Sequence, residues 1–351
     1  MTLIELFREN SFQNVVSALS YKPQLLVYLI SPKALAKYRK PTENFFKNKK
    51  TDQKIIWYPC NTDDLNCLIS TLERIVFNNP DCAADVNGSE GLMLLALGRT
   101  LEKYPDKLKI LKLNTSPAKL SVAEMISLVG GSLDSSQRPD FDISQKLWSI
   151  LKNDPDKFNR AVWELNGCIE KAPDNGFFFE KVPGEDSLYL LEELEKLSLC
   201  TKTEDKIILK NPSFILKAGN ALEAKVLWAL SELCDDAVMG ANLDWDGQRL
   251  GNDTNNEIDV LACRNAKLVF ISCKNGTFDE NELYKLAAVA SRFGSEDSLK
   301  AIVASAMGKL SSPARQRLEQ RARDMGIILI SGVHKMSDSQ FSEEMKRLIP
   351  R

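Results

Sequence analysis

The chain has 351 residues, of which 44% are hydrophobic and 27% are charged, and its formal net charge is −2. This length suits two or three domains with separate cores, and the near-neutral charge excludes a global electrostatic attraction to nucleic acid or anionic membranes. The only histidine, His334, nearly excludes histidine-based metal or acid–base chemistry.

Cysteine usage and the start of the chain indicate a cytoplasmic protein. No Cys-x-x-Cys pair occurs among the eight cysteines, which favours reduced thiols over a zinc site or a disulfide framework. No apolar run approaches the length of a membrane span. The first residues include Glu5, Arg8 and Glu9 and lack a signal-peptide pattern. We therefore expect a cytoplasmic protein with no membrane association.

Residues 1–120 alternate between short apolar strands and helical patterns, which is typical of a parallel sheet covered on both faces. The expected strands are Leu3–Phe7, Leu25–Ile30, Lys54–Tyr58, Ala83–Val86 and Lys109–Leu113. The expected helices are Gln13–Leu19, Asp63–Phe77 and Gly91–Tyr104. These elements predict a Rossmann-like α/β domain.

Two loops in this domain are candidate ligand sites because they follow strands at the carboxyl edge of the predicted sheet. They span Glu9–Asn14 and Asp85–Gly91, and each leads into a helix N-terminus, whose free N–H groups suit phosphate. The second loop has neither a Walker ending nor a Gly-x-Gly-x-x-Gly pattern. A plain strand-to-helix turn is therefore an equal alternative.

The remaining chain divides into a helical connector, residues 121–205, and a second α/β domain, residues 206–351. The end of the connector could form a small winged-helix-like unit. The connector helices are expected at Ser121–Leu128, Ile143–Asn153, Asp156–Leu165 and Asp186–Leu197. The last domain is expected to contain helices Ala221–Leu233, Glu280–Phe293 and Ser312–Met325 and strands Ala237–Leu243, Glu257–Cys263, Leu268–Cys273, Lys300–Ala304 and Ile327–Ile330.

A predicted hairpin in the last domain carries the candidate chemistry. Residues 256–263 and 267–274 read as two strands joined by a short polar turn, so Asp259 and Lys274 can meet at one strand end. Glu223 on the preceding helix and the main-chain carbonyl of Cys273 would add oxygen ligands for Mg²⁺ or Mn²⁺. Such ions neutralise charge and activate water in phosphodiester hydrolysis. The alternative is a surface ion pair of little energetic weight.

These residues resemble the PD-(D/E)XK restriction-endonuclease-like superfamily, through Glu223, Ile258-Asp259-Val260 and Ile271-Ser272-Cys273-Lys274. The wider motifs resemble one subfamily, in which the nuclease is fused to a CRISPR-associated Rossmann-fold (CARF) sensor domain. These motifs are Gly219–Glu223, Asn256–Leu261, Phe270–Gly276, Glu282–Leu286 and Arg292–Gly294.

The resemblance implies a homodimer that binds a cyclic oligoadenylate, commonly cyclic tetra-adenylate, in type III CRISPR antiviral defence. Binding would activate a metal-dependent endonuclease that cuts DNA and/or RNA with little sequence preference. Glu223, Asp259 and Lys274 would be catalytic, and Glu223, Asp259 and the Cys273 carbonyl would hold the metal. The expected ring-nucleotide residues are Ser11, Phe12, Gln13, Asn14, Asp85, Asn87, Gly88 and Ser89.

One position departs from the superfamily pattern, because Ser272 stands where Glu or Asp usually precedes the lysine by two residues. Ser272 and Glu257 are therefore auxiliary candidates, and metal binding is expected to be weaker or to rely on the other acids. The alternative function is a cyclic-oligoadenylate-binding signalling protein whose nuclease domain does not cleave.

Basic side chains near the predicted site are candidates for contact with a nucleic-acid backbone. Residues 313–323 carry four arginines, including Arg315 and Arg317, and the preceding helix carries Lys285 and Arg292. A solvated helix face is an equal explanation for the arginines.

Overall fold

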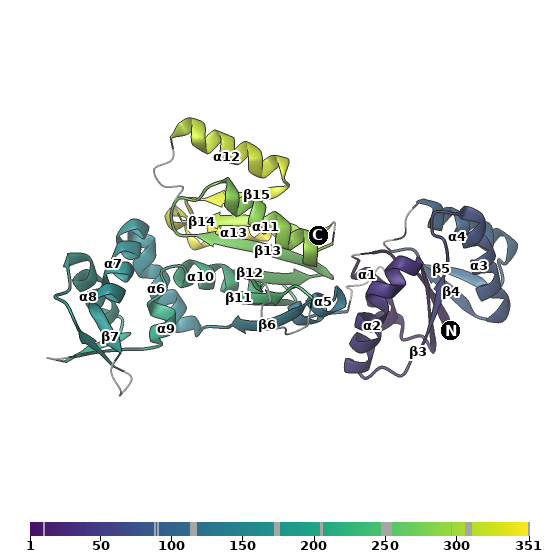
Figure 1. Cartoon of the computed structure of the whole chain (residues 1–351), viewed down its shortest axis with the longest axis horizontal. Helices are drawn as coiled ribbons and strands as arrows, with labels where there is room; N and C mark the ends of the chain where they lie inside the picture. Colours follow the sequence, from purple (N-terminus) through teal and green to yellow (C-terminus); the bar gives the residue numbers. More distant parts are fainter. Residues whose placement is uncertain are drawn as a thin grey trace.

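The computed structural model describes residues 1–9, 11–87, 89, 91–112, 118–171, 176–203, 206–246, 255–295, 297–305 and 311–349. The chain is an α/β protein with an N-terminal five-stranded parallel sheet of Rossmann-like form and a C-terminal mixed sheet. Figure 1 shows the N-terminal sheet at one end of the long axis, the mixed sheet in the middle and a mostly helical part at the other end. The predicted fold class is confirmed.

The N-terminal sheet has the order β3-β2-β1-β4-β5, and all its pairings are parallel. Strand β1 lies in the centre and is buried along its whole length, which explains its nearly continuous apolar sequence. The strands are β1 (Thr2–Leu6), β2 (Leu25–Ile30), β3 (Lys54–Pro59), β4 (Cys82–Asp85) and β5 (Leu108–Leu111). Because β1 and β4 are neighbours, the loops that follow them meet at one edge.

Four helices cover the two faces of this sheet. They are α1 (Gln13–Tyr21), α2 (Pro32–Asn48), α3 (Leu65–Asn78) and α4 (Gly91–Lys103). Buried side chains of α1 and α2 belong to one apolar cluster, and those of α3 and α4 belong to another. Helix α2 is not among the predicted elements. It begins with Ser31, whose side chain accepts a hydrogen bond from the Ala34 N–H, and it continues through the interior Pro41.

The segment that follows the N-terminal sheet in the sequence is mostly helical and contains a small antiparallel sheet of order β7-β8-β10-β9. Its elements are α5 (Val122–Leu128), β6 (Ser132–Gln137), α6 (Phe141–Asn153), α7 (Pro155–Cys168), β7 (Ile169–Lys171), β8 (Phe177–Phe179), α8 (Glu185–Lys196), β9 (Cys200–Lys202) and β10 (Lys206–Leu209). Strand β6 pairs with β11 and forms one edge of the C-terminal sheet. Residues 121–205 therefore contribute to more than one layer.

The C-terminal sheet has the order β15-β14-β13-β12-β11-β6. Strands β13, β14 and β15 run parallel, and the other pairings are antiparallel. Its remaining strands are β11 (Asp236–Asp244), β12 (Asn255–Arg264), β13 (Lys267–Lys274), β14 (Leu299–Ala304) and β15 (Ile327–Ser331). The last segments are α9 (Pro212–Ile215), α10 (Asn220–Ser231), α11 (Glu280–Phe293), α12 (Ser312–Asp324), the 3-10 helix η1 (Val333–Lys335) and α13 (Asp338–Lys346).

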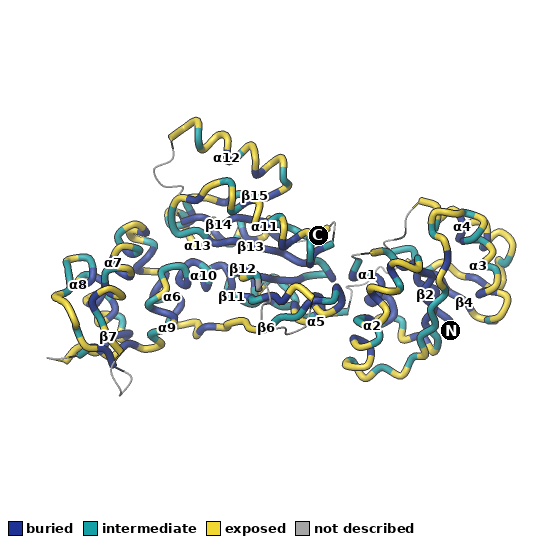
Figure 2. The backbone as a smooth tube through the Cα atoms, in the orientation of Figure 1, coloured by how far each residue is buried: buried dark blue, intermediate teal, exposed yellow. Residues whose placement is uncertain are grey.

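Helices sandwich the C-terminal sheet, so its central strands lie in the core. Apolar residues of α10 and α13 join one buried cluster, and those of α11 and α12 join the cluster that continues into the N-terminal domain. Figure 2 shows β12 and β13 largely buried and most of α12 exposed. Within the described ranges, no helix combines the length and the apolar character that a membrane crossing requires.

Candidate functional site

The candidate site lies at the open end of the β12–β13 hairpin. At the other end, Asn265 and Ala266 form the turn with left-handed φ values of 53° and 57°, and Arg264 pairs with Lys267. A two-residue turn with positive φ at both positions matches the twist of the strands. This register brings Asp259 of β12 and Lys274 of β13 together, with 3.7 Å between Asp259 Oδ2 and Lys274 Nζ.

Asp259 is fixed by three groups of the neighbouring strand. Its Oδ2 accepts hydrogen bonds from the Ser272 hydroxyl at 3.1 Å and from the Cys273 N–H at 2.6 Å, and it also faces the Lys274 ammonium. The contacts that the structure describes for this carboxylate all go to Oδ2. Oxygen Oδ1 is therefore the atom that remains for a ligand. Ser272 stands in the predicted place, but its hydroxyl supports Asp259.

Glu223 lies in the first turn of α10 and faces the same site. Burial raises the pKa of its carboxyl to about 8, with further increases from the negative charges of Asp259 and Glu257, while Lys274 opposes them. Gly219 provides room for this side chain, because a Cβ atom at position 219 would lie 2.7 Å from Glu223 Oε1. Without a cation the carboxyl therefore keeps its proton at neutral pH, and a bound cation would favour its ionised form.

Glu282, in the first turn of α11, is a site residue to which the sequence assigned no role. Its Oε2 lies 2.9 Å from Lys274 Nζ, closer than Asp259, and its Oε1 lies 2.8 Å from Lys285 Nζ. Burial opposes ionisation of Glu282, but hydrogen bonds from the two lysines give it a lowered pKa. Burial likewise tends to lower the pKa of Lys274, and Asp259 and Glu282 outweigh it, so that the pKa is raised and the lysine stays cationic.

Two asparagines connect the site to the middle part of the chain. Asn275, which follows Lys274, donates from Nδ2 to Asn159 Oδ1 of α7 and to the Ala218 carbonyl, each at 3.0 Å. The Asn159 amide in turn donates to the Asn275 carbonyl. Asn275 therefore connects the end of β13 both to α7 and to the segment that leads into the helix of Glu223.

The oxygen atoms at this site are of the type that binds Mg²⁺ or Mn²⁺ when water supplies most of the ligands. Among the described residues, no group of three His, Cys, Asp or Glu side chains is arranged to hold a metal ion. Glu223, Asp259 and the Cys273 carbonyl are the groups that could supply oxygen ligands, because Mg²⁺ commonly takes only one or two carboxylates and keeps several waters. The Cys273 thiol is buried, which raises its pKa well above the usual value. Glu257 is exposed near this end of β12.

The candidate ring-nucleotide loops lie at the carboxyl ends of β1 and β4, and several of their side chains are used inside the fold. Phe12 belongs to the buried apolar cluster. Asn14 accepts from the Arg8 N–H and donates to the carbonyls of Arg8 and Ser11. The buried Asp85 accepts from the hydroxyl of Ser17 and from Asn87.

The residues of these loops with more accessible side chains are Ser11, Gln13, Asn87 and Ser89. Gly88 lies outside the described residues. The buried side chains therefore hold the two loops in their conformation, and the partly exposed side chains lie on the outer surface of the loops.

The four candidate nucleic-acid contacts differ in their surroundings. Lys285 is largely exposed beside Glu282, and Arg315 and Arg317 are exposed on α12. Arg292 donates to the carbonyls of Val129 and Trp245, which ties α11 to neighbouring segments. Its guanidinium is used for packing within the fold.

No protein-family model and no curated protein matches the sequence. Solved structures match in fold. Protein VC1899 from Vibrio cholerae superposes with a TM-score of 0.76 at 13% identity, covering 100% of this chain and 99% of that chain. Can2 from Sulfobacillus thermosulfidooxidans, solved in complex with cyclic tetra-adenylate, gives 0.66 at 16% identity, with 99% and 98% coverage.

A third structure, a type III CRISPR defence DNA nuclease activated by cyclic oligoadenylate, gives a TM-score of 0.55 at 14% identity. It covers 99% of this chain, and this chain spans 51% of it. At such identities the likeness shows a shared fold over the full length of the present chain.

Proposed function

We propose that the protein is a divalent-metal-dependent endonuclease that cuts DNA and/or RNA and is activated by cyclic tetra-adenylate in type III CRISPR defence. The observation that carries this proposal is the convergence of Asp259, Lys274 and Glu223 at one sheet end. We assign residues 1–120 to a CARF sensor, 121–205 to a connector and 206–351 to a PD-(D/E)XK nuclease-like domain. The fold shared with the cyclic tetra-adenylate complex of Can2 supports the sensor assignment.

In the proposed reaction, Glu223, Asp259 and the Cys273 carbonyl would hold Mg²⁺ or Mn²⁺. The bound ion would supply charge neutralisation and an activated water. Lys274 donates its N–H groups to the scissile phosphate or to the attacking water, and its positive charge offsets the charge that develops on the phosphate. Ser272 and the Cys273 N–H hold the Asp259 carboxylate in a fixed orientation.

The hairpin provides a physical route from the proposed sensor to this site. Ala266 of its turn and Lys267, the first residue of β13, line a small cavity together with Ser11 and Gln13 of the first ligand loop. A ligand that binds the loop preferentially in one arrangement would shift the hairpin toward that arrangement. Two-fold pairing of the chain would suit a ring ligand, because a symmetric ring can contact equivalent loops of both copies.

Ser272 favours a second candidate function, a cyclic-oligoadenylate-binding protein that does not cleave. With serine in place of the usual acidic residue, the site offers two carboxylates and a carbonyl, one carboxylate fewer than the superfamily pattern. The two functions differ in one measurable property, which is phosphodiester cleavage.

A cleavage assay on the full chain tests the proposal. We expect cutting of plasmid DNA, single-stranded DNA or RNA only when both cyclic tetra-adenylate and Mg²⁺ or Mn²⁺ are present. Asp259→Asn should retain ring binding and lose cleavage on the order of a hundredfold or more, since it removes a metal ligand. Ring binding without any cleavage would favour the signalling protein, and undiminished cleavage by Asp259→Asn would exclude this site.

A further inference from the structure

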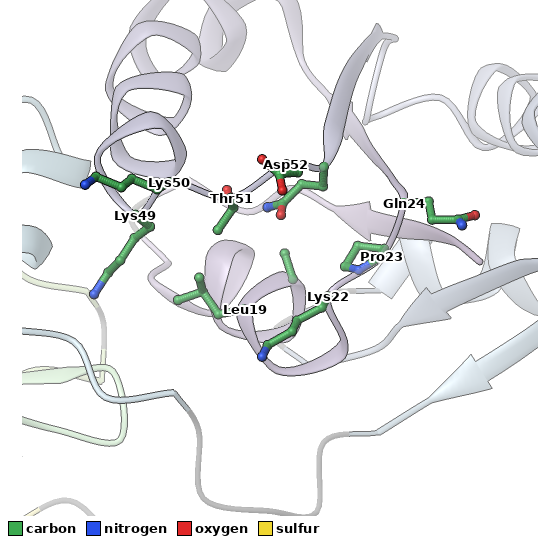
Figure 3. Close-up of a pocket in the computed structure, with 10 residues that line it drawn as sticks. Leu19, Lys22, Pro23, Gln24, Lys49, Lys50, Thr51 and Asp52 are labelled. Atoms are coloured by element: carbon green, nitrogen blue, oxygen red, sulfur yellow. The ribbon is translucent and has the colours of Figure 1, made fainter.

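A cavity of about 600 Å³ lies at the edge of the N-terminal sheet opposite the two candidate ring-nucleotide loops. It is formed where α1 and α2 end and where the chain enters β2 and β3 (Figure 3). Its volume falls within the range of small-molecule sites. The lining residues are Ala18, Leu19, Lys22, Pro23, Gln24, Lys49, Lys50, Thr51, Asp52 and Gln53.

The lining is rich in positive charge. Figure 3 shows Lys22, Lys49 and Lys50 reaching from the two helix ends toward the same side of the cavity. Lys49 is paired with Glu124 of α5 at 2.6 Å, whereas Lys22 and Lys50 are exposed and have no ion-pair partner within the described part of the chain. Asp52 is the one acidic residue among the described lining residues, so this lining has a net positive charge.

Both unpaired lysines have left-handed backbone conformations, with φ of 47° at Lys22 and 52° at Lys50. Glycine or asparagine is the usual residue at such helix ends, because an L side chain in this conformation is strained. A cation near a helix C-terminus interacts favourably with the helix dipole, and this accounts for one lysine at the end of α1 and one at the end of α2. Lys49 already fills that role for α2, so the helix dipole does not account for Lys50.

A third donor faces no partner inside the protein. The side-chain Nε2 of Gln53 is buried without a hydrogen-bond acceptor. A buried unpaired amide is costly. Gln53 lines the cavity together with Lys22 and Lys50, beside an apolar wall formed by Ala18, Leu19 and Pro23.

We infer that this cavity binds a phosphorylated small molecule of nucleotide size. Phosphate oxygens accept from ammonium and amide donors, and charge-assisted bonds of this kind are the stronger ones. The apolar wall contributes contact area for the remainder of the ligand. Because Gln13 begins α1 and Lys22 follows its end, one helix connects this cavity with the first ring-nucleotide loop. The site does not depend on the proposed nuclease function.

Calorimetric titration of the full chain in EDTA, which removes divalent ions from the nuclease site, tests the inference with pyrophosphate, ATP and adenosine as probes. We expect saturable binding of pyrophosphate and ATP that weakens with salt, tighter binding of ATP, and no binding of adenosine. The variant Lys22→Glu/Lys50→Glu should lose about tenfold or more in ATP affinity. Lys33→Glu/Lys40→Glu, with the same charge change on exposed positions of α2, should retain it.

Gln53→Leu separates a binding role from a structural one. It removes an unpaired buried donor, so we expect unchanged or higher thermal stability together with several-fold weaker ATP binding. Absence of saturable ATP binding, equal binding of adenosine, or ATP affinity unchanged in Lys22→Glu/Lys50→Glu would overturn the inference.

Discussion

Replacing Glu223 by glutamine is expected to stabilise the folded protein, and to do so more at pH 7 than at pH 5. Burial and the neighbouring Asp259 and Glu257 raise the pKa of Glu223 from an ordinary 4.5 to about 8. Between these values the folded protein keeps a proton that the unfolded chain has released. The free energy of unfolding therefore falls as the pH rises through this window.

The magnitude follows from the pKa difference. At pH 7 the cost corresponds to roughly 3 kcal/mol, since each pKa unit is worth about 1.4 kcal/mol. Solvent reaching the partly exposed carboxyl reduces it to about half that value. At pH 5 the cost is below about 1 kcal/mol. Glutamine keeps the size of the side chain and carries no charge, so Glu223→Gln avoids the cost at both pH values.

Urea denaturation in EDTA at pH 5 and pH 7 measures this difference. Glu232→Gln, at an exposed position at the other end of α10, serves as the matched control. Addition of Mg²⁺ should narrow the gap between wild type and Glu223→Gln at pH 7, because a bound cation stabilises the carboxylate. A stability difference that is the same at pH 5 and pH 7 would refute the reasoning about the charge at this site.

Three further substitutions test the surroundings of the two proposed sites. Ser272→Glu restores the usual acidic residue, so the Mg²⁺ concentration for half-maximal cleavage should fall about tenfold; an unchanged value would show that the metal does not reach this position. Asn159→Ala removes the amide pair with Asn275 and should lower the free energy of unfolding by about 1–2 kcal/mol in urea; unaltered stability would contradict that contact. Tyr28→Phe removes the 2.7 Å hydrogen bond to the Asn14 carbonyl under the first ring-nucleotide loop, with an expected loss of about 1–2 kcal/mol, and a neutral effect would show that the loop does not depend on it.

Local sequence patterns were sufficient for the elements that position the candidate site. Alternation of apolar residues located β12, and a continuous apolar run, Leu268–Ile271, located β13. The two-residue turn then fixed a register that places Asp259 near Lys274. The strands of the N-terminal sheet were likewise found from short apolar runs. In each case the information lies within a few neighbouring residues.

Helix α2 and strand β6 were missed, each for a different reason. Helix α2 contains Pro41 in its interior, and proline normally indicates a break. Strand β6 has the polar sequence Ser-Leu-Asp-Ser-Ser-Gln, and its structure comes from pairing with β11 about a hundred residues later.

The role of Glu282 was hidden for a related reason. An acid in the first turn of a helix ordinarily complements the helix dipole. Only the packing of α11 against β13 shows that this carboxylate reaches Lys274. The sequence does show that Glu282 lies near the start of the helix that follows Lys274. That position alone did not specify a contact between the two side chains.

Two paired lysines offer the most direct test of the central claim. Lys274 of β13 and Lys146 of α6 are each paired with a carboxylate, and their side chains are 26% and 30% exposed. Cleavage by Lys274→Ala and Lys146→Ala should therefore be compared in the presence of cyclic tetra-adenylate and Mn²⁺. The account predicts that Lys274→Ala binds the ring but does not cut, while Lys146→Ala cuts like the wild type. Equal cleavage by both variants would contradict it.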